Sequence, residues 1–307
     1  MEFQRLALVV VDEQHRFGVQ QRALLREKGQ QAGNFPHQLL MTATPIPRTL
    51  AMSVYADLDC SSIDELPPGR TPVTTSVLSN TRRHEVIQRI EEACRAGRQA
   101  YWICTLIEES EQLQCQAAEK TAQEFQQILP DIKIGLVHGR LKAKDKEAVM
   151  NDFKLGKIQL LVATTVVEVG VDVPNASLMV IENAERLGLS QLHQLRGRVG
   201  RGKVVSHCLL LYQQPLSALA QERLTVMRAT TDGFKIAEED LKLRGPGEVF
   251  GTRQTGNIEF RVANILRDSD LLHVVQRAAQ QLLSDYPGMI EKIIQRWIGK
   301  KEEYAQV

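Results

Sequence analysis

The chain has 307 residues, 43% of them hydrophobic and 24% charged, and its formal net charge is +1; this length allows two domains with separate cores, and any nucleic-acid surface must come from local clusters of basic residues. Five scattered cysteines, with neither a C-x-x-C pair nor metal-ligand spacing, exclude a disulfide framework and fit a reducing compartment. No apolar run approaches the roughly 20 residues that a bilayer requires, and no signal-peptide pattern begins the chain, so we expect a cytoplasmic protein without a membrane partner.

The first 72 residues contain two short strands and a linker. An apolar run over residues 6–11 predicts a strand buried on both faces. A second, short strand is predicted over residues 39–42. Three prolines and a glycine between residues 61 and 72 are typical of an interdomain linker. We therefore expect a partial domain over residues 1–60 and a linker over 61–72.

Strands and helices alternate between residues 73 and 213. The predicted strands cover residues 73–78, 100–104, 132–137, 158–163, 178–181 and 204–212. The predicted helices are one capped by Thr81 and ended by Gly97, and three over residues 115–129, 142–155 and 189–196. This alternation indicates an α/β fold with a parallel sheet and helices on both faces. Ligands of such sheets gather at the carboxyl ends of the strands.

The pattern changes after residue 213. Two helices are predicted over residues 216–230 and 234–242, separated by Asp232-Gly233, and a glycine-rich stretch follows. The last segment carries an amphipathic helical stripe at Leu271, Val275, Ala278 and Leu282. We expect a helical hairpin with the glycine-rich stretch over residues 214–257 and a helical tail over 258–307.

An acidic pair, Asp12-Glu13, follows the first predicted strand. Metal-assisted hydrolysis of ATP needs such a pair, because one carboxylate holds Mg²⁺ against the β and γ phosphates and the other orients or deprotonates the attacking water. The alternative for this pair alone is a strand that runs into a polar turn.

A more specific pattern is Gln194-x-x-Gly197-Arg198-x-Gly200-Arg201. Two arginines at this spacing can both reach a γ-phosphate that is bound to a neighbouring domain, as arginine fingers do in phosphoryl transfer. The alternative is a flexible Arg-Gly loop that contacts RNA or solvent.

Small hydroxyl residues lie between these two patterns, in residues 163–174. Thr164 and Thr165 at a strand end can donate to backbone phosphates without reading bases, and Asp172 can accept from the ribose hydroxyl of ATP. The alternative is a plain connection between a strand and a loop.

Two basic clusters stand out against the neutral total. One begins with His138-Gly139-Arg140 at a strand end and continues through Lys142, Lys144 and Lys146; we expect phosphate contacts there. The other consists of Arg82, Arg83, Arg89, Arg95 and Arg98. We interpret the second cluster as a solvated helix face.

Together these patterns resemble superfamily-2 helicases, and more closely the RecG family of bacterial ATP-dependent DNA helicases. Residues 12–19, 41–50 and 63–70 carry the closer resemblance, and residues 240–256 are similar to the translocation motif that this family shares with the transcription-repair coupling factor. The Asp12-Glu13-Gln14-His15 string, and a chain that ends about 50 residues after the glycine-rich stretch, favour RecG over the coupling factor.

The resemblance implies RecA-like sheets and a role for each matching residue. Asp12 would bind Mg²⁺, Glu13 would activate water, Asp172 would touch the ribose, Gln194 would sense the nucleotide, and Arg198 and Arg201 would contact the γ-phosphate. The residues implied in coupling the nucleotide state to DNA are Gln14, His15, Thr42, Thr44, Arg244, Arg253 and Gln254. Those expected to contact DNA are His138, Gly139, Arg140, Thr164 and Thr165.

The resemblance also implies an activity. The family remodels branched DNA by reversing stalled forks and driving branch migration of Holliday junctions, with ATP and Mg²⁺ as cofactors. We expect branched or double-stranded DNA as the partner, a monomer, and a single-stranded-DNA-binding protein as a further partner. The alternatives are a non-catalytic DNA-binding remnant and the motor of a transcription-repair coupling factor.

One departure from the family pattern is large. No Gly-x-x-x-x-Gly-Lys-Ser/Thr phosphate loop occurs in the 307 residues, and the sequence does not contain the family's amino-terminal wedge domain. Since backbone amides and a lysine of that loop normally hold the phosphates, we expect this chain alone to bind ATP poorly and not to hydrolyse it. We also expect residues 1–60 to pack poorly, with unpaired strand edges, and residues 73–212 to fold.

Overall fold

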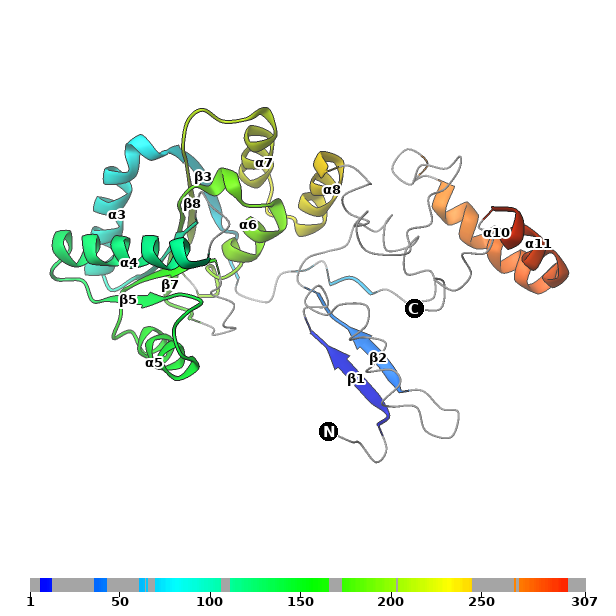
Figure 1. The fold of residues 1–307 in the computed structure, drawn as a ribbon, viewed down its shortest axis with the longest axis horizontal. Helices are drawn as coiled ribbons and strands as arrows, with labels where there is room; N and C mark the ends of the chain where they lie inside the picture. The colour runs from blue at the N-terminus through cyan, green and yellow to red at the C-terminus, as the bar shows by residue number, and fades with distance from the viewer. Residues whose placement is uncertain are drawn as a thin grey trace. The chain divides into compact units, whose positions relative to one another are not determined.

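The computed structural model describes residues 6–12, 36–42, 61–63, 65, 70–105, 111–165, 173–202, 204–244, 268 and 271–297. The chain divides into two compact units: residues 61–240 form one, and residues 1–60 with 241–307 form the other. Figure 1 shows the described helices and strands. Among the described residues, no helix combines the length and the apolar character needed to cross a membrane.

The unit of residues 61–240 is built on a six-stranded sheet in the order β3-β8-β7-β4-β6-β5. The strands are β3 (Thr74–Ser79), β4 (Gln99–Cys104), β5 (Ile134–Val137), β6 (Leu160–Thr164), β7 (Ala176–Ile181) and β8 (His207–Tyr212). Every pairing in this sheet is parallel. The predicted α/β fold with a parallel sheet is therefore confirmed.

Helices cover both faces of this sheet. They are α3 (Arg83–Arg95), α4 (Glu111–Ile128), α5 (Ala143–Lys154), α6 (Leu189–Arg196) and α7 (Ala218–Ala229). Neighbouring residues of β4 point to opposite faces. On one face Trp102 meets Phe125 of α4 edge-to-face at 4.8 Å between ring centroids, and on the other Tyr101 meets Phe153 of α5 at 4.9 Å.

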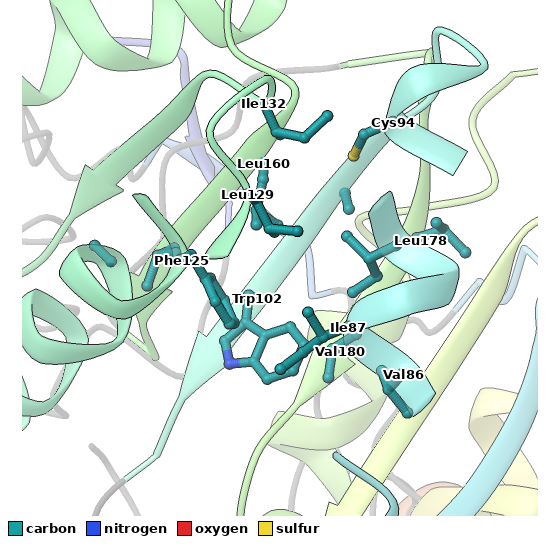
Figure 2. Close-up of a cluster of buried hydrophobic side chains, with 14 of the residues drawn as sticks. Val86, Ile87, Cys94, Trp102, Phe125, Leu129, Ile132, Leu160, Leu178 and Val180 are labelled. Atoms are coloured by element: carbon teal, nitrogen blue, oxygen red, sulfur yellow. The ribbon is translucent and has the colours of Figure 1, made fainter. Parts of the chain in front are cut away.

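The core on the α3–α4 face is a single apolar cluster (Figure 2). It combines the inward residues of α3 and α4 with alternate residues of the central strands, including Val86, Ile87, Cys94, Trp102, Phe125, Leu129, Leu160, Leu178 and Val180. The near-continuous apolar runs of β4, β6 and β7 reflect burial on both faces.

Arg83 covers the edge of this core. Its guanidinium lies 5.2 Å from the Trp102 ring centroid and 5.3 Å from that of Phe125. It also pairs with Glu182 and Glu124, each at 2.7 Å. A cation in contact with aromatic rings and two carboxylates is a structural element, so Arg83 does not belong to a solvated helix face.

The other described contacts of this basic cluster support the surface interpretation for two of its members. Arg82 pairs with Glu85 at 2.6 Å and Arg95 with Glu91 at 2.7 Å, on exposed helix surface. Arg98 instead donates to Ser177 Oγ at 2.7 Å and so joins the turn between α3 and β4 to β7.

Several element boundaries differ from the predicted ones. Ser79, not Thr81, begins the first helical segment, because the Ser79 hydroxyl accepts from the Thr81 amide ahead of a short 3₁₀ turn, η2 (Asn80–Arg82). β2 covers His37–Leu40 and so ends earlier than expected. In the predicted helical tail, the predicted stripe lies on α10 (Leu272–Asp285) and its N-cap residue Leu271, and a second helix follows, α11 (Pro287–Trp297). Pro287 starts α11, a position that proline favours because its missing N–H is not needed there.

The other unit contains a two-stranded parallel sheet of β1 (Leu8–Val11) and β2. Leu8 and Val10 are 54% and 53% exposed, and Leu39 is 49% exposed, so its strands are not packed on both faces by the described residues. This agrees with the expectation of poor packing there, and the prediction that the strand of residues 6–11 is buried on both faces is wrong, because alternate residues of β1 are exposed. The apolar stripe of the tail is also uncovered, since Leu271 and Val275 are each 57% exposed.

α8 (Gly233–Arg244) begins after Asp232, whose carboxylate accepts from the Phe234 amide at 2.8 Å.

Replacing the buried Leu160 of β6 with alanine should lower the free energy of unfolding by about 2–5 kcal/mol, because the change removes buried methyl groups and leaves a cavity. Leu155→Ala is the matched control: Leu155 is 60% exposed and should cost less than about 1 kcal/mol. Urea unfolding can be followed by Trp102 fluorescence in a Trp297→Phe background, since the chain has two tryptophans. Equal losses in the two variants would contradict the described core.

Candidate functional site

Residues 197–202, here called the arginine loop, follow α6 directly. The amides of Gly197, Arg198 and Val199 donate to the carbonyls of residues 193, 195 and 196 and close tight turns at the helix end. Val199 is fully buried, and Gly200 has a φ of 79°, which favours glycine. The loop is thus a fixed turn that presents Arg198 and Arg201 on either side of a buried anchor.

The arginine loop lies at the amino edge of the sheet, by which we mean the side where the amino ends of the parallel strands lie. A Cβ added at Gly200 would lie 2.7 Å from Val73 Cγ2 and 3.9 Å from Ser206 Cβ, and these two residues come just before β3 and β8. His138 and Thr164 lie at the opposite, carboxyl edge, where β5 and β6 end. The predicted arginines and the predicted phosphate contacts therefore occupy different edges of this sheet.

Backbone packing holds the last residue of the loop. A Cβ at Gly202 would collide with the carbonyl oxygen of Pro174, which lies just before β7. The segment after Asp172 and the arginine loop are thus in direct contact, and only glycine fits at position 202.

Arg196 is the group that ties the end of α6 to its surroundings. It is 3% exposed, and its guanidinium donates to the carbonyls of Met227 at 3.0 Å and Thr230 at 2.8 Å. Both carbonyls belong to the carboxyl end of α7, where the helix dipole favours a cation. Burial lowers the pKa of Arg196 from its usual value, but these hydrogen bonds hold a charged guanidinium in place.

His193, one turn before Arg196, shares this environment. Its Nδ1 lies 3.1 Å from Arg196 Nη2. Burial and then the charge of Arg196 lower the pKa of His193 to about 4, with a smaller lowering from Arg70 and an opposing effect from Asp232. His193 is therefore neutral near pH 7 and can accept from Arg196.

At the carboxyl edge, two buried polar atoms have no hydrogen-bond partner among the described residues. They are Thr164 Oγ1, in a residue that is 1% exposed, and His138 Nδ1, in a residue that is 7% exposed. The strands that carry them pair directly, with Val137 opposite Ala163. Buried polar atoms without partners are costly, so their occurrence on two neighbouring strand ends makes this edge a candidate ligand site.

The loop after His138 completes this edge. Arg140 is exposed, and the Gly139 carbonyl accepts from Lys146 Nζ at 2.7 Å, which brings an ammonium group of α5 to the loop. His138 Nε2 lies 3.4 Å from Glu119 Oε1. Thr165 follows Thr164 as a half-buried residue. These residues offer donors and positive charge to an anion.

In the other unit, Asp12 and Thr42 come together at one sheet edge. β1 and β2 are parallel neighbours, and the Met41 amide donates to the Val11 carbonyl at 2.8 Å, so both side chains follow adjacent strand ends. Asp12 is exposed. No group of three or more acidic, histidine or cysteine side chains that could hold a metal occurs in the described parts of the chain.

The remaining predicted site residues are only partly visible. Gln194 is half-buried on α6, and Arg244 is the last residue of α8. The residues that lie outside the described ones are Glu13, Gln14, His15, Thr44, Asp172, Arg253 and Gln254.

Sequence reasoning missed Arg196, His193 and Arg70. A signal existed for Arg196, since its spacing from Leu189 and Leu192 places it on the buried face of α6. Arg70 donates to the Gly197 carbonyl across 127 residues, and no local pattern in the linker indicates such a contact.

Two protein families match this chain. Residues 83–203 match the family described as "Helicase conserved C-terminal domain", and residues 230–298 match "ATP-dependent DNA helicase RecG, domain 3, C-terminal". The ATP-dependent DNA helicase RecG of Pasteurella multocida is 63% identical over 308 residues, which covers all of this chain. The chain belongs to the RecG family.

Further RecG relatives match equally well. RecG of Escherichia coli K12 is 63% identical over 99% of this chain. A solved structure of RecG bound to a three-way DNA junction aligns with 88% of this chain at 43% identity and a TM-score of 0.66, and the match covers 34% of that structure's chain. The present chain spans 44% of the length of the P. multocida and E. coli relatives.

The low pKa of His193 predicts a loss of stability in acid. Because its pKa in the folded chain is about 4, below the ordinary 6.5, only the unfolded chain takes up this proton between these values. The contribution of neutral His193 to the free energy of unfolding is fully present above pH 6.5. It is lost as pH falls toward 4, by at most about 3 kcal/mol.

His193→Gln keeps an acceptor for Arg196 but cannot titrate, so its free energy of unfolding should fall less than that of the unchanged chain between pH 6.5 and 4. Urea unfolding at several pH values measures the difference. His84→Gln, on the exposed side of α3, should leave the pH dependence unaltered. A His193→Gln profile that parallels the unchanged chain would contradict the described environment.

Proposed function

We propose that this chain is the motor portion of an ATP-dependent DNA helicase that remodels branched DNA in recombination and repair, by fork reversal and by branch migration of Holliday junctions. The observation that carries the proposal is the arginine loop, a fixed turn that presents two guanidinium groups around the buried Val199. The relative bound to a three-way junction supports branched DNA as the substrate class.

The proposed role of Arg198 and Arg201 is to stabilise the negative charge that develops on the γ-phosphate. Guanidinium groups suit this role because they stay charged and can donate two parallel hydrogen bonds to phosphate oxygens. Gln194, three residues before the loop on α6, is proposed to sense the same phosphate. Asp172 is proposed to hold the ribose.

Asp12 is proposed to hold Mg²⁺. Magnesium sites in nucleotide enzymes use one or two carboxylates together with phosphate oxygens, so the exposed Asp12 carboxylate beside Thr42 fits such a site. Bound Mg²⁺ supplies neutralisation of phosphate charge. Glu13 is proposed to take the proton of the attacking water.

Seven residues are proposed to couple the nucleotide state to DNA translocation. These are Gln14, His15, Thr42, Thr44, Arg244, Arg253 and Gln254. Because this sequence holds no phosphate loop, we propose that the chain hydrolyses ATP only when a separate amino-terminal half supplies that loop.

DNA is proposed to bind the carboxyl edge of the six-stranded sheet. Thr164, Thr165, His138, Gly139 and Arg140 would contact backbone phosphates, which give sequence-independent binding. The position of Thr164 and His138 on two neighbouring strand ends, beside the exposed Arg140, supports this.

A second candidate function is DNA binding without catalysis. The observation that favours it is the six-stranded parallel sheet of residues 74–212, which lies within one compact unit. The third alternative, a transcription-repair coupling factor, is less well supported because residues 230–298 match the RecG-specific domain. We further propose a monomeric cytoplasmic protein that also contacts a single-stranded-DNA-binding protein.

Thr164→Val should separate stability from binding. The change removes a buried hydroxyl without a partner among the described residues, so we expect the free energy of unfolding to rise by about 1 kcal/mol. DNA binding should weaken about tenfold, because one phosphate donor is lost. Fluorescence anisotropy with a labelled three-way junction measures the binding, and urea unfolding measures the stability.

Thr225→Val is the matched control. The exposed Thr225 hydroxyl donates to the Gln221 carbonyl within α7, so its loss should leave DNA binding unchanged. If Thr164→Val binds the junction as tightly as the unchanged chain, the proposed role of this edge is wrong.

Arg198→Ala and Arg201→Ala test the motor. We would measure ATP hydrolysis by the purified chain with branched DNA, alone and mixed with the separately produced amino-terminal half of the P. multocida relative. We expect activity only in the mixture, and a kcat roughly 10³-fold lower for each arginine variant. Arg95→Ala, which removes an exposed arginine of α3, should keep full activity.

Two results would contradict the proposal. Hydrolysis by the chain alone, abolished by Glu13→Gln, would show that a phosphate loop is not required. Junction binding without hydrolysis in either sample would leave the non-catalytic function.

A further inference from the structure

The segment that leads into β3 lies against the arginine loop. Arg70 Nη2 donates to the Gly197 carbonyl at 3.0 Å. A Cβ at Gly200 would lie 2.7 Å from Val73 Cγ2 and 3.5 Å from the Thr71 carbonyl oxygen. Residues 70–73 therefore follow the loop along its length, although more than 120 residues separate them in the sequence.

The Gly197 carbonyl is the point where two guanidinium groups meet. It accepts from Arg70 at 3.0 Å and from Arg201 Nε at 3.4 Å. Hydrogen bonds from charged donors are stronger than neutral ones. Gly197 is also the residue at which α6 ends and the loop begins, so a change in its carbonyl direction alters the turn that carries Arg198.

We propose that Arg70 is a positioning residue for the arginine loop: through the shared Gly197 carbonyl, the linker segment sets the orientation of Arg201. The inference rests on the proposed role of Arg201 at the γ-phosphate. In this role Arg70 acts through the Gly197 carbonyl, the acceptor to which Arg201 Nε also donates.

Arg70 lies near the end of the linker predicted over residues 61–72, in the same compact unit as the arginine loop. Its hydrogen bond to the Gly197 carbonyl therefore connects the segment just before β3 with the end of α6.

Hydrogen–deuterium exchange of the purified chain tests the positioning directly and does not depend on ATP. In Arg70→Ala, the amides of Gly197, Arg198 and Val199, which close the turn, should exchange about tenfold faster, as expected for the loss of one hydrogen bond from a charged group. Arg70→Lys retains a cationic donor and should restore slow exchange. Arg95→Ala should match the unchanged chain. Unaltered exchange of these amides in Arg70→Ala would overturn the proposal.

Kinetics in the mixture with the amino-terminal half test the consequence. Arg70→Ala should lower kcat about tenfold or more with a smaller change in the KM for ATP, because Arg201 acts on the developing charge rather than on ground-state binding. Arg70→Lys should recover most of the rate. Faster exchange with an unchanged kcat would refute the link from loop order to catalysis.

These outcomes separate the inference from the proposed function. If the unchanged chain hydrolyses no ATP in the mixture, the motor function fails, and the exchange data alone decide whether Arg70 orders the loop. If the mixture is active and Arg201→Ala abolishes the activity while Arg70→Ala leaves both exchange and kcat unaltered, the motor function stands and the role of Arg70 is rejected.

Discussion

Arg196 carries a positive charge into the interior of the unit of residues 61–240, and the arrangement around the arginine loop depends on how that charge is satisfied. An isolated buried cation would be strongly unfavourable. Here the carboxyl-terminal carbonyls of α7 and the neutral His193 supply the acceptors. The same contacts fix α6 against α7, and the arginine loop begins at the next residue. The contacts that offset the cost of burying the Arg196 guanidinium thus also fix the start of the loop that carries Arg198 and Arg201.

A second constraint comes from the direction of the strands. Because all six strands are parallel, the sheet has one carboxyl edge and one amino edge, and a helix that follows a strand must return across a face. α6 makes this return, so the arginine loop and the buried hydroxyl of Thr164 lie at opposite edges. A nucleotide contact and a DNA contact can then be carried by one rigid sheet without competing for the same surface.

Much of this fold could be predicted from the sequence, for identifiable reasons. The central strands are apolar throughout, because both faces are covered, and α6 was predicted over the same residues that form it. Boundaries were less accurate where a side chain competes for the backbone. Ser79 caps the first turn in place of Thr81 because a 3₁₀ segment precedes α3.

The candidate site was only partly predictable. The strings that contain Arg198, Arg201 and Thr164 could be recognised in the sequence, because arginines and hydroxyl residues are the types that phosphate binding uses. Arg70 and the contact of Gly202 with Pro174 were not, since both join segments distant in the chain through backbone atoms. Periodicity could have identified Arg196, but a charged residue on an apolar helix face is ordinarily assigned to the surface.

The strand order also bears on how this sheet is made. β3, the first strand of the sheet in the chain, is an outer strand, and its partner among the described strands is β8, the last. On a ribosome that adds 5–20 residues per second, β3 would wait on the order of ten seconds for its partner. β3 would stay unpaired while β4 to β7 assemble. The pairing of β3 with β8 would then be the late, non-local step of co-translational folding. Pairing of β8 with β3 would also bring residues 70–73 next to the arginine loop. The loop would therefore become ordered only when nearly the whole unit has left the ribosome.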